Sequence, residues 1–208
     1  MMPVEPPIRA YTSPRRAAAA DKTRARIVAA ARDLLTGGDK RPPFSLEGVA
    51  KRADVTRLTV YHQFASKRGL LEAVFDDVAR EGGLVEDLPK LFAHTGIEAA
   101  LREFVRVFCR FWAYRSGIMP KLASQMRNDE DIVESLTQRI ERRRQVLATL
   151  VRRLLPKMKD KAAADLVDVL FASTGFEMYE ALSVRSRSAK AVEALMQRIV
   201  EQTLREFQ

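Results

Sequence analysis

FSLEGVAKRADVTRLTVYHQFASK, residues 44–67, contains two short helical patterns separated by a tight turn. Ser45 and Thr56 stand where each helix begins, and a side-chain hydroxyl at that position accepts a hydrogen bond from an otherwise free backbone N–H. Asp54 stands at the turn, and Asp tolerates left-handed dihedrals better than most residues. Two short helices joined in this way predict a helix-turn-helix, whose second helix lies in the DNA major groove.

The second helix of this stretch has two different faces. Val60 and Phe64, four residues apart, predict a buried face. The remaining positions carry polar, basic and aromatic side chains: Arg57, Thr59, Tyr61 and His62. Leu58 is open to two interpretations, since it can pack inward or meet a thymine methyl group in the groove.

This segment resembles the recognition segment of the tetracycline-repressor (TetR) family. The resemblance rests on VTRLTVYHQF at residues 55–64, followed by Ser66-Lys67 and the aliphatic pair Leu70-Leu71. Two positions depart from the family pattern: Asp54 stands where Gly is usual, and Leu58 where a small residue or Pro is common. The resemblance implies an all-α fold of about nine helices, with an N-terminal three-helix helix-turn-helix domain and a C-terminal helical domain for ligand binding and dimerisation.

The composition is that of a globular protein without a membrane segment. The chain has 208 residues, of which 47% are hydrophobic and 30% charged, as in soluble domains. It contains no run of about 18 apolar residues and no secretory signal pattern. Cys109 is the single cysteine, which excludes an internal disulfide and fits a reducing compartment. We expect a cytoplasmic protein.

Positive charge is concentrated near the predicted helix-turn-helix. The formal net charge is +9, and residues 1–69 account for +8 of it, with 14 Lys/Arg against 6 Asp/Glu. A surface that binds DNA needs cations against phosphates. The alternative is that these residues only solvate the surface, because charge alone does not identify a polyanion.

Three segments are predicted. Residues 1–20 are interpreted as a flexible basic arm, in which Arg9, Arg15 and Arg16 either enter a minor groove or have no role. Residues 21–68, opening at Asp21 or Thr23, form the DNA-binding domain. Residues 69–208 form the effector-binding and dimerisation domain. Within it we expect irregular chain over 84–95 and helices over 97–116, 118–127, 131–155, 161–184 and from 189 onward.

An aromatic stripe marks the helix predicted over 97–116. Its rings recur at i, i+4, i+7 and i+8 from Phe104, which is either a core face or the wall of a pocket for a small molecule. The predicted pocket contains Phe75, Phe104, Phe108, Phe111, Trp112, Met126, Phe171 and Met178.

The last two helices are apolar over more of their circumference than one packing face requires, so they are expected to be buried on two sides. In the TetR family these helices pair with their copies in a second subunit. The predicted dimer interface contains Leu166, Leu170, Phe176, Val192, Leu195 and Ile199.

No catalytic or metal-binding motif occurs. His62 and His94 have no metal-ligand partner at helical spacing, and there is no nucleophile elbow or phosphate-binding glycine loop. We therefore predict a protein that is not an enzyme and has no cofactor and no metal.

The leading hypothesis is a one-component regulator, a repressor that binds a palindromic double-stranded operator as a homodimer and is released by a largely apolar effector. The predicted DNA contacts are Ser45, Thr56, Arg57, Thr59, Tyr61, His62 and Lys67. By motif position, Arg57 and Thr59 are expected to read base edges. Ser45, Tyr61, His62 and Lys67 are expected to contact phosphates and fix the register. The alternatives are a helical protein that binds or transforms small molecules with an incidental basic N-terminus, and a DNA binder with no effector.

Overall fold

The computed structural model describes residues 14–36, 44–115 and 130–207. These residues form ten helices and, within the same ranges, no strand. The helices are α1 (Pro14–Thr36), α2 (Leu46–Arg52), α3 (Arg57–Phe64), α4 (Lys67–Glu81), α5 (Leu84–Leu91), α6 (Ile97–Arg115), α8 (Glu130–Leu154), α9 (Asp160–Ser173), α10 (Phe176–Leu182) and α11 (Ala189–Phe207). The predicted all-α class is confirmed.

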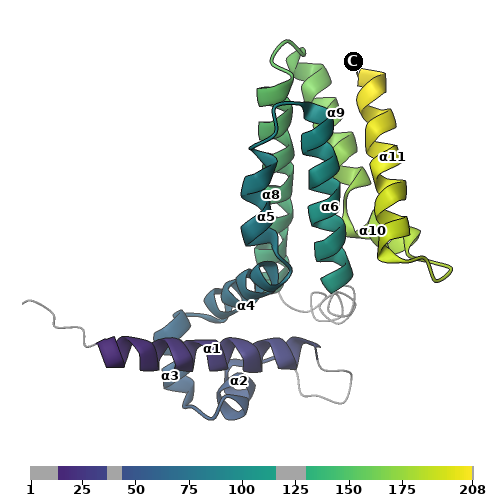
Figure 1. The fold of residues 1–208 in the computed structure, drawn as a ribbon. Helices are drawn as coiled ribbons and strands as arrows, with labels where there is room; N and C mark the ends of the chain where they lie inside the picture. The colour runs from purple at the N-terminus through teal and green to yellow at the C-terminus, as the bar shows by residue number, and fades with distance from the viewer. Residues whose placement is uncertain (1–13, 37–43, 116–129, 208) are drawn as a thin grey trace, which may run out of the picture.

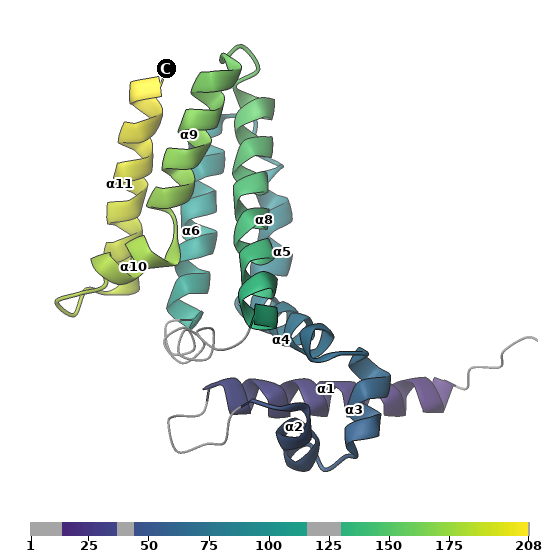
Figure 2. The same cartoon turned by 180° about the vertical axis from the view of Figure 1, so that it is seen from behind.

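The helices form two layers that α4 connects. Helices α1, α2 and α3 pack together beneath an upright bundle of α5, α6, α8, α9 and α11 (Figures 1 and 2). Helix α4 contacts α1 and α3 on one side and α5 and α8 on the other. Among the described helices, α4 therefore provides the main packing contact between the bundle and the lower layer.

Local signals decide the lower layer. The Ser45 hydroxyl accepts from the Gly48 N–H at 3.0 Å, and the Thr56 hydroxyl accepts from the Thr59 N–H at 3.1 Å. Both predicted N-caps are confirmed. Asp54 adopts a left-handed φ of 52° at the turn between α2 and α3, as expected for a residue that makes this turn.

The start of α1 differs from the prediction. The helix begins at Pro14, so residues 14–20 are helical and the predicted boundary of the arm at residue 20 is wrong. Pro is favoured in the first turn of a helix, and four consecutive alanines at residues 17–20 have the highest helix propensity. Arg9 lies outside the described residues, as do the side chains of Arg15 and Arg16.

Two further predictions in the bundle are wrong. Residues 84–91 form α5 although Pro89 lies inside it, because Leu84, Leu88 and Leu91 share a face that packs toward α6. The helix predicted over 161–184 is broken at Gly175, which starts α10 in an extended conformation. These two differences raise the helix number above nine. The helix predicted over 118–127 lies outside the described residues.

Candidate nucleic-acid interface and effector site

Helix α3 is anchored by its apolar face. Val60 and Phe64 are buried in the core of the lower layer. Arg24 of α1 fixes the end of α3, since its Nη1 donates to the Gln63 carbonyl at 2.8 Å and its guanidinium lies 4.4 Å from the Phe64 ring centroid. The opposite face is thereby held outward.

The outward face of α3 carries the predicted groove contacts. Arg57 and His62 are exposed, and Tyr61 is 57% exposed. Leu58, for which the sequence left two interpretations, is 61% exposed and points away from the core. A bulky apolar side chain in such a position can meet a thymine methyl group.

Four of the predicted DNA contacts also make contacts within the protein. The hydroxyls of Thr56 and Thr59 lie 2.9 Å apart, and Thr59 is half-buried. Ser45 uses its hydroxyl as the cap of α2. Lys67 is half-buried with Nζ 5.8 Å from the Phe44 ring centroid. A hydroxyl that accepts as a cap can still donate to a phosphate oxygen.

A charged cluster joins the lower layer to the bundle. Arg32 of α1 pairs with Asp77, at 3.1 Å, and with Glu81, both on α4. Tyr114 of α6 donates a hydrogen bond to the same Glu81 carboxylate. The hydrogen bonds from Arg32 and then Tyr114 hold the pKa of Glu81 below its usual range. The sequence did not indicate this cluster, because the residues that pair across the three helices are 33 to 49 positions apart in the chain.

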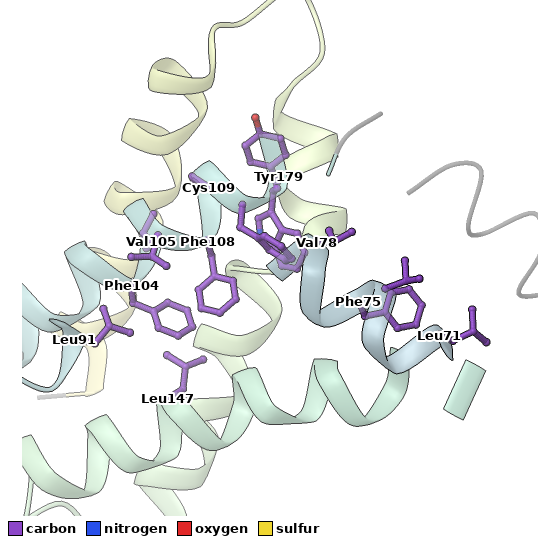
Figure 3. Close-up of a cluster of buried hydrophobic side chains, with 14 of the residues drawn as sticks. Leu71, Phe75, Val78, Leu91, Phe104, Val105, Phe108, Cys109, Leu147 and Tyr179 are labelled. Carbon is purple, nitrogen blue, oxygen red and sulfur yellow. The ribbon is translucent and has the colours of Figure 1, made fainter. Parts of the chain in front are cut away.

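The predicted pocket residues on α6 pack as a continuous aromatic core. Ring centroids lie 4.5 Å apart for Phe104 and Phe108, and 5.1 Å apart for Phe111 and Trp112. All four side chains are buried. Figure 3 shows Phe104 and Phe108 directed from α6 toward Leu147, with Phe75 on α4 at the other end of the cluster.

The other predicted pocket residues are less enclosed. Phe171 and Met178 are half-buried against the core, while Met126 lies outside the described residues. A surface cavity of about 440 Å³ lies where α4, α5 and α6 meet, and a second of about 310 Å³ lies between α8 and α9. Neither cavity is lined by the eight predicted residues, so in this conformation the aromatic stripe fills the core.

A buried arginine completes the aromatic core. Arg143 of α8 is only 8% exposed, and its guanidinium carbon lies 4.1 Å from the Phe171 ring centroid and 5.9 Å from that of Trp112. Burial lowers the pKa of Arg143 to about 10, so the group remains charged at neutral pH. In the sequence, Arg143 is one of several arginines close together on the helix predicted over 131–155, a pattern that is typical of a solvated face. The only signal in favour of burial was the apolar stripe of α8, which reaches Leu147 and Leu150 at four and seven residues from it.

The predicted dimer residues divide into two groups. Leu166, Leu170 and Val192 are buried inside the protomer, because α9 and α11 pack on each other and on α6 and α8. They are therefore core residues, and this part of the interface prediction is corrected. Phe176, Leu195 and Ile199 are only half-buried. Val169, which the prediction did not include, is 42% exposed on α9.

Two observations concern other classes of site. Within residues 14–36, 44–115 and 130–207, no three His, Cys, Asp or Glu side chains are grouped as a metal ion would require. None of the helices formed by these residues is long and apolar enough to cross a membrane.

Comparison with known proteins agrees with this geometry. The family described as "Bacterial regulatory proteins, tetR family" matches residues 27–74, which extend from α1 into α4. No curated protein matches the sequence.

Solved structures share the fold over most of the chain. A putative TetR-family transcriptional regulator from Mesorhizobium loti has a TM-score of 0.64 at 16% identity, covering 90% of this chain and 97% of the other. A transcriptional regulator from Rhodococcus sp. has a TM-score of 0.61 at 16% identity, covering 88% and 96%. A putative transcriptional regulator from Saccharomonospora viridis, in complex with choline, has a TM-score of 0.61 at 15% identity, covering 87% and 96%.

A helix-turn-helix with an exposed second helix, joined to a helical bundle, defines a DNA-binding transcription regulator. The family match over residues 27–74 and the shared fold narrow this class of protein further. Residues 27–74 match the N-terminal domain of the TetR family, and the chain shares the fold of a solved TetR-family transcriptional regulator over most of its length.

Proposed function

We propose that this protein is a repressor that binds a roughly palindromic operator as a homodimer and is released by a small-molecule effector. The observation that carries the proposal is the exposed face of α3, where Arg57, Leu58 and Tyr61 stand outward from a helix anchored by buried Val60 and Phe64. Members of this family are generally not enzymes, and we propose no catalytic role.

The side chains of α3 and its flanks divide into two kinds of contact. Arg57 reads a base edge, with guanine as the favoured partner of its two parallel donors. Leu58 meets a thymine methyl group beside it. Ser45, Tyr61, His62 and Lys67 bind phosphates and fix the register of the helix in the groove.

Dimerisation is proposed through the outer faces of α9 and α11. Val169, Leu195 and Ile199 leave apolar surface uncovered on these two helices, and a second copy would bury it. A two-fold dimer presents two α3 helices, so the operator half-sites would be about one helical turn or a multiple apart.

Effector control is proposed to act through α4. The bundle has two conformers, and an effector that binds one of them more tightly shifts the population. The Arg32–Glu81–Tyr114 cluster ties α1, α4 and α6 together, so it transmits a change in α6 to the spacing of the two α3 helices. The structure from Saccharomonospora viridis was determined in complex with choline, which supports small-molecule binding by this fold.

One observation favours a second candidate, a DNA binder without an effector. The aromatic stripe on α6 is fully packed rather than lining an open cavity. An effector would then have to open the core as it binds. Release of the operator by any small molecule that also raises Tm would reject this second candidate.

The proposed function is tested by a mobility-shift titration on the DNA upstream of the protein's own gene, with a scrambled fragment of equal length as control. We expect the upstream fragment to bind at least about 10³-fold more tightly than the scrambled one, with a stoichiometry of two chains per site. Equal affinity for both fragments would reject sequence-specific regulation.

A further inference from the structure

The centre of the bundle contains a cation surrounded by aromatic rings. The guanidinium of Arg143 lies over Phe171 of α9 at 4.1 Å and faces Phe108 and Trp112 of α6, each at 5.9 Å from the ring centroid. The side chain is more than nine-tenths buried. Long charged side chains are almost never buried to this degree unless they are paired.

No acidic side chain in the described part of the chain forms an ion pair with Arg143. Arg143 Nη1 donates to the Phe171 carbonyl and to the Thr174 hydroxyl, each at 2.8 Å, and both acceptors are neutral. Among the residues that the structure describes, no carboxylate oxygen lies within 4.0 Å of the guanidinium. The nearby acid is Glu177, which is exposed at the start of α10 and acts only at longer range. A buried charge whose counter-charge is distant is destabilising, and an anion bound next to the guanidinium would relieve this.

Gly175 lies between Arg143 Nη2 and the Glu177 carboxylate. A Cβ added at Gly175 would lie 3.5 Å from Nη2 and 3.0 Å from Glu177 Oε2, so a larger residue here would crowd both groups. Gly175 has an ordinary φ of −71°, so its backbone conformation does not require glycine. Both hydrogen bonds that Arg143 forms with the described residues use Nη1, so Nη2 and Nε have no hydrogen-bond partner among these residues.

We propose that Arg143 binds the carboxylate of an organic acid with an apolar or aromatic body, and that this acid is the effector. The assignment rests on the proposed function, whose ligand class it specifies. A carboxylate matches the planar donors of a guanidinium in a bidentate geometry. The aromatic side chains around Arg143 would contact the apolar body of the acid, as in most small-molecule sites.

A cationic effector does not fit this site. Aromatic cages bind quaternary ammonium groups through the faces of their rings. Here the ring faces already hold guanidinium groups, because Arg143 lies 4.1 Å and Arg144 lies 4.0 Å from the Phe171 ring centroid. A further cation would be repelled by both. We therefore expect the site to differ in charge preference from one that takes choline.

A thermal-shift comparison of matched compounds tests the proposal on the unaltered protein. The acids are benzoate and octanoate, which distinguish an aromatic from an aliphatic body; benzamide and 1-octanol are their neutral counterparts, and choline is the cation. At millimolar concentration we expect at least one acid to raise Tm by about 3 °C or more, because a ligand that binds only the native state stabilises it. The neutral counterparts and choline are expected to leave Tm within about 1 °C. Equal shifts from acid and neutral counterpart, a shift from choline, or no shift from either acid would overturn the proposal.

Variants then assign the effect to Arg143. Arg143→Gln should lose the acid-dependent shift, while Arg142→Gln, an exposed neighbour on the same helix, should keep it. Glu177→Gln should keep or increase the shift, because the competing negative charge is removed. An acid shift that survives in Arg143→Gln contradicts the assignment. If Arg143→Gln does not fold, the comparison of acids with their neutral counterparts on the unaltered protein still tests whether binding requires a carboxylate.

Operator binding by the ligand-free protein, measured on the same preparations, separates this proposal from the proposed function. Specific DNA binding without an acid shift would reject only the carboxylate effector. An acid shift without specific DNA binding would reject only the regulator.

Discussion

The two layers of the molecule place their cations in opposite environments. On α3 and its flanks, Arg57 and His62 face solvent, where water and salt weaken each charge and many phosphates can be partners. In the bundle, Arg143 is enclosed by rings, where an unpaired charge is costly and a single matching anion would be strongly favoured. Under the two proposals, arginine side chains would therefore serve broad attraction to DNA in one layer and selective binding of an anion in the other.

The two layers also differ in what stabilises them. The lower layer depends on backbone details: two hydroxyl caps, the left-handed Asp54, and a close approach at Gly69. The bundle depends on buried volume, with Phe104, Leu101 and Leu147 almost fully enclosed. Substitutions in the two layers should consequently have different effects on the free energy of unfolding and on operator binding.

The largest expected effect is in the bundle. Phe104→Ala should lower the free energy of unfolding by about 3–5 kcal/mol, because it removes a fully buried ring and leaves a cavity. Chemical denaturation measures this loss. Phe92→Ala, at an exposed ring, is the control and should cost less than about 1 kcal/mol. Similar losses for both variants would contradict the packing described for α6.

A glycine at the junction of the layers comes next. In Gly69→Ala the new Cβ would meet the Phe64 carbonyl oxygen at 2.2 Å, so the end of α3 must move relative to α4. We expect a loss of about 1–3 kcal/mol in stability and a larger proportional loss of operator binding. Gly96→Ala is the matched control, since nothing lies within 4 Å of its added Cβ. Unchanged DNA affinity in Gly69→Ala would show that this contact does not position α3.

The cap of α3 should have an intermediate effect. Thr56→Ala removes the acceptor of the Thr59 N–H and should cost about 1 kcal/mol, as measured by urea unfolding. The same change in the bundle, Thr149→Ala at an exposed mid-helix position, should be neutral or slightly stabilising, since Ala has the higher helix propensity. Equal changes in the free energy of unfolding for Thr56→Ala and Thr149→Ala would contradict the conclusion that the lower layer depends on its hydroxyl caps.

The smallest expected effect concerns pH and the cluster that joins the layers. The pKa of Glu81 is lowered in the folded protein, so its contribution is complete above the ordinary value of 4.5 and is lost as pH falls below it. In Glu81→Gln, the loss in free energy of unfolding below pH 4.5 should therefore be smaller than in the parent protein. The difference should be about 0.5 kcal/mol, as for a partly exposed pair.

The control for this pH prediction is Glu86→Gln, because Glu86 forms no ion pair with any residue that the structure describes. Its acid sensitivity should match that of the parent protein. A Glu81→Gln variant with the same pH profile as the parent would show that the cluster contributes nothing to stability.

Local signals explain why the lower layer was well predicted. The caps at Ser45 and Thr56 and the turn at Asp54 each depend on two or three neighbouring residues, so the sequence determines them directly. The start of α1 was missed because the alanine run at residues 17–20 was interpreted as part of a Pro-rich arm.

In the bundle, packing between distant segments decided the outcome. The aromatic stripe on α6 was visible as a pattern, but whether it lined a cavity or filled a core depended on α8 and α9, which come later in the chain. Leu166 and Leu170 were assigned to a dimer interface because their helix is apolar on several sides, and they are instead covered within the protomer. The burial of Arg143 and the link from Arg32 to Glu81 require contacts across 28 to 49 residues, which helical periodicity cannot reveal.

The central claim is that the outward face of α3 reads DNA sequence. The most direct test is the ratio of dissociation constants for scrambled and upstream DNA, compared between the parent protein, Arg57→Ala and the control Arg52→Ala, whose guanidinium is paired with Asp33 on α1. We predict that Arg57→Ala reduces this ratio by about 5- to 150-fold, equivalent to 1–3 kcal/mol, while Arg52→Ala preserves it. A ratio that is unchanged in Arg57→Ala would contradict the claim.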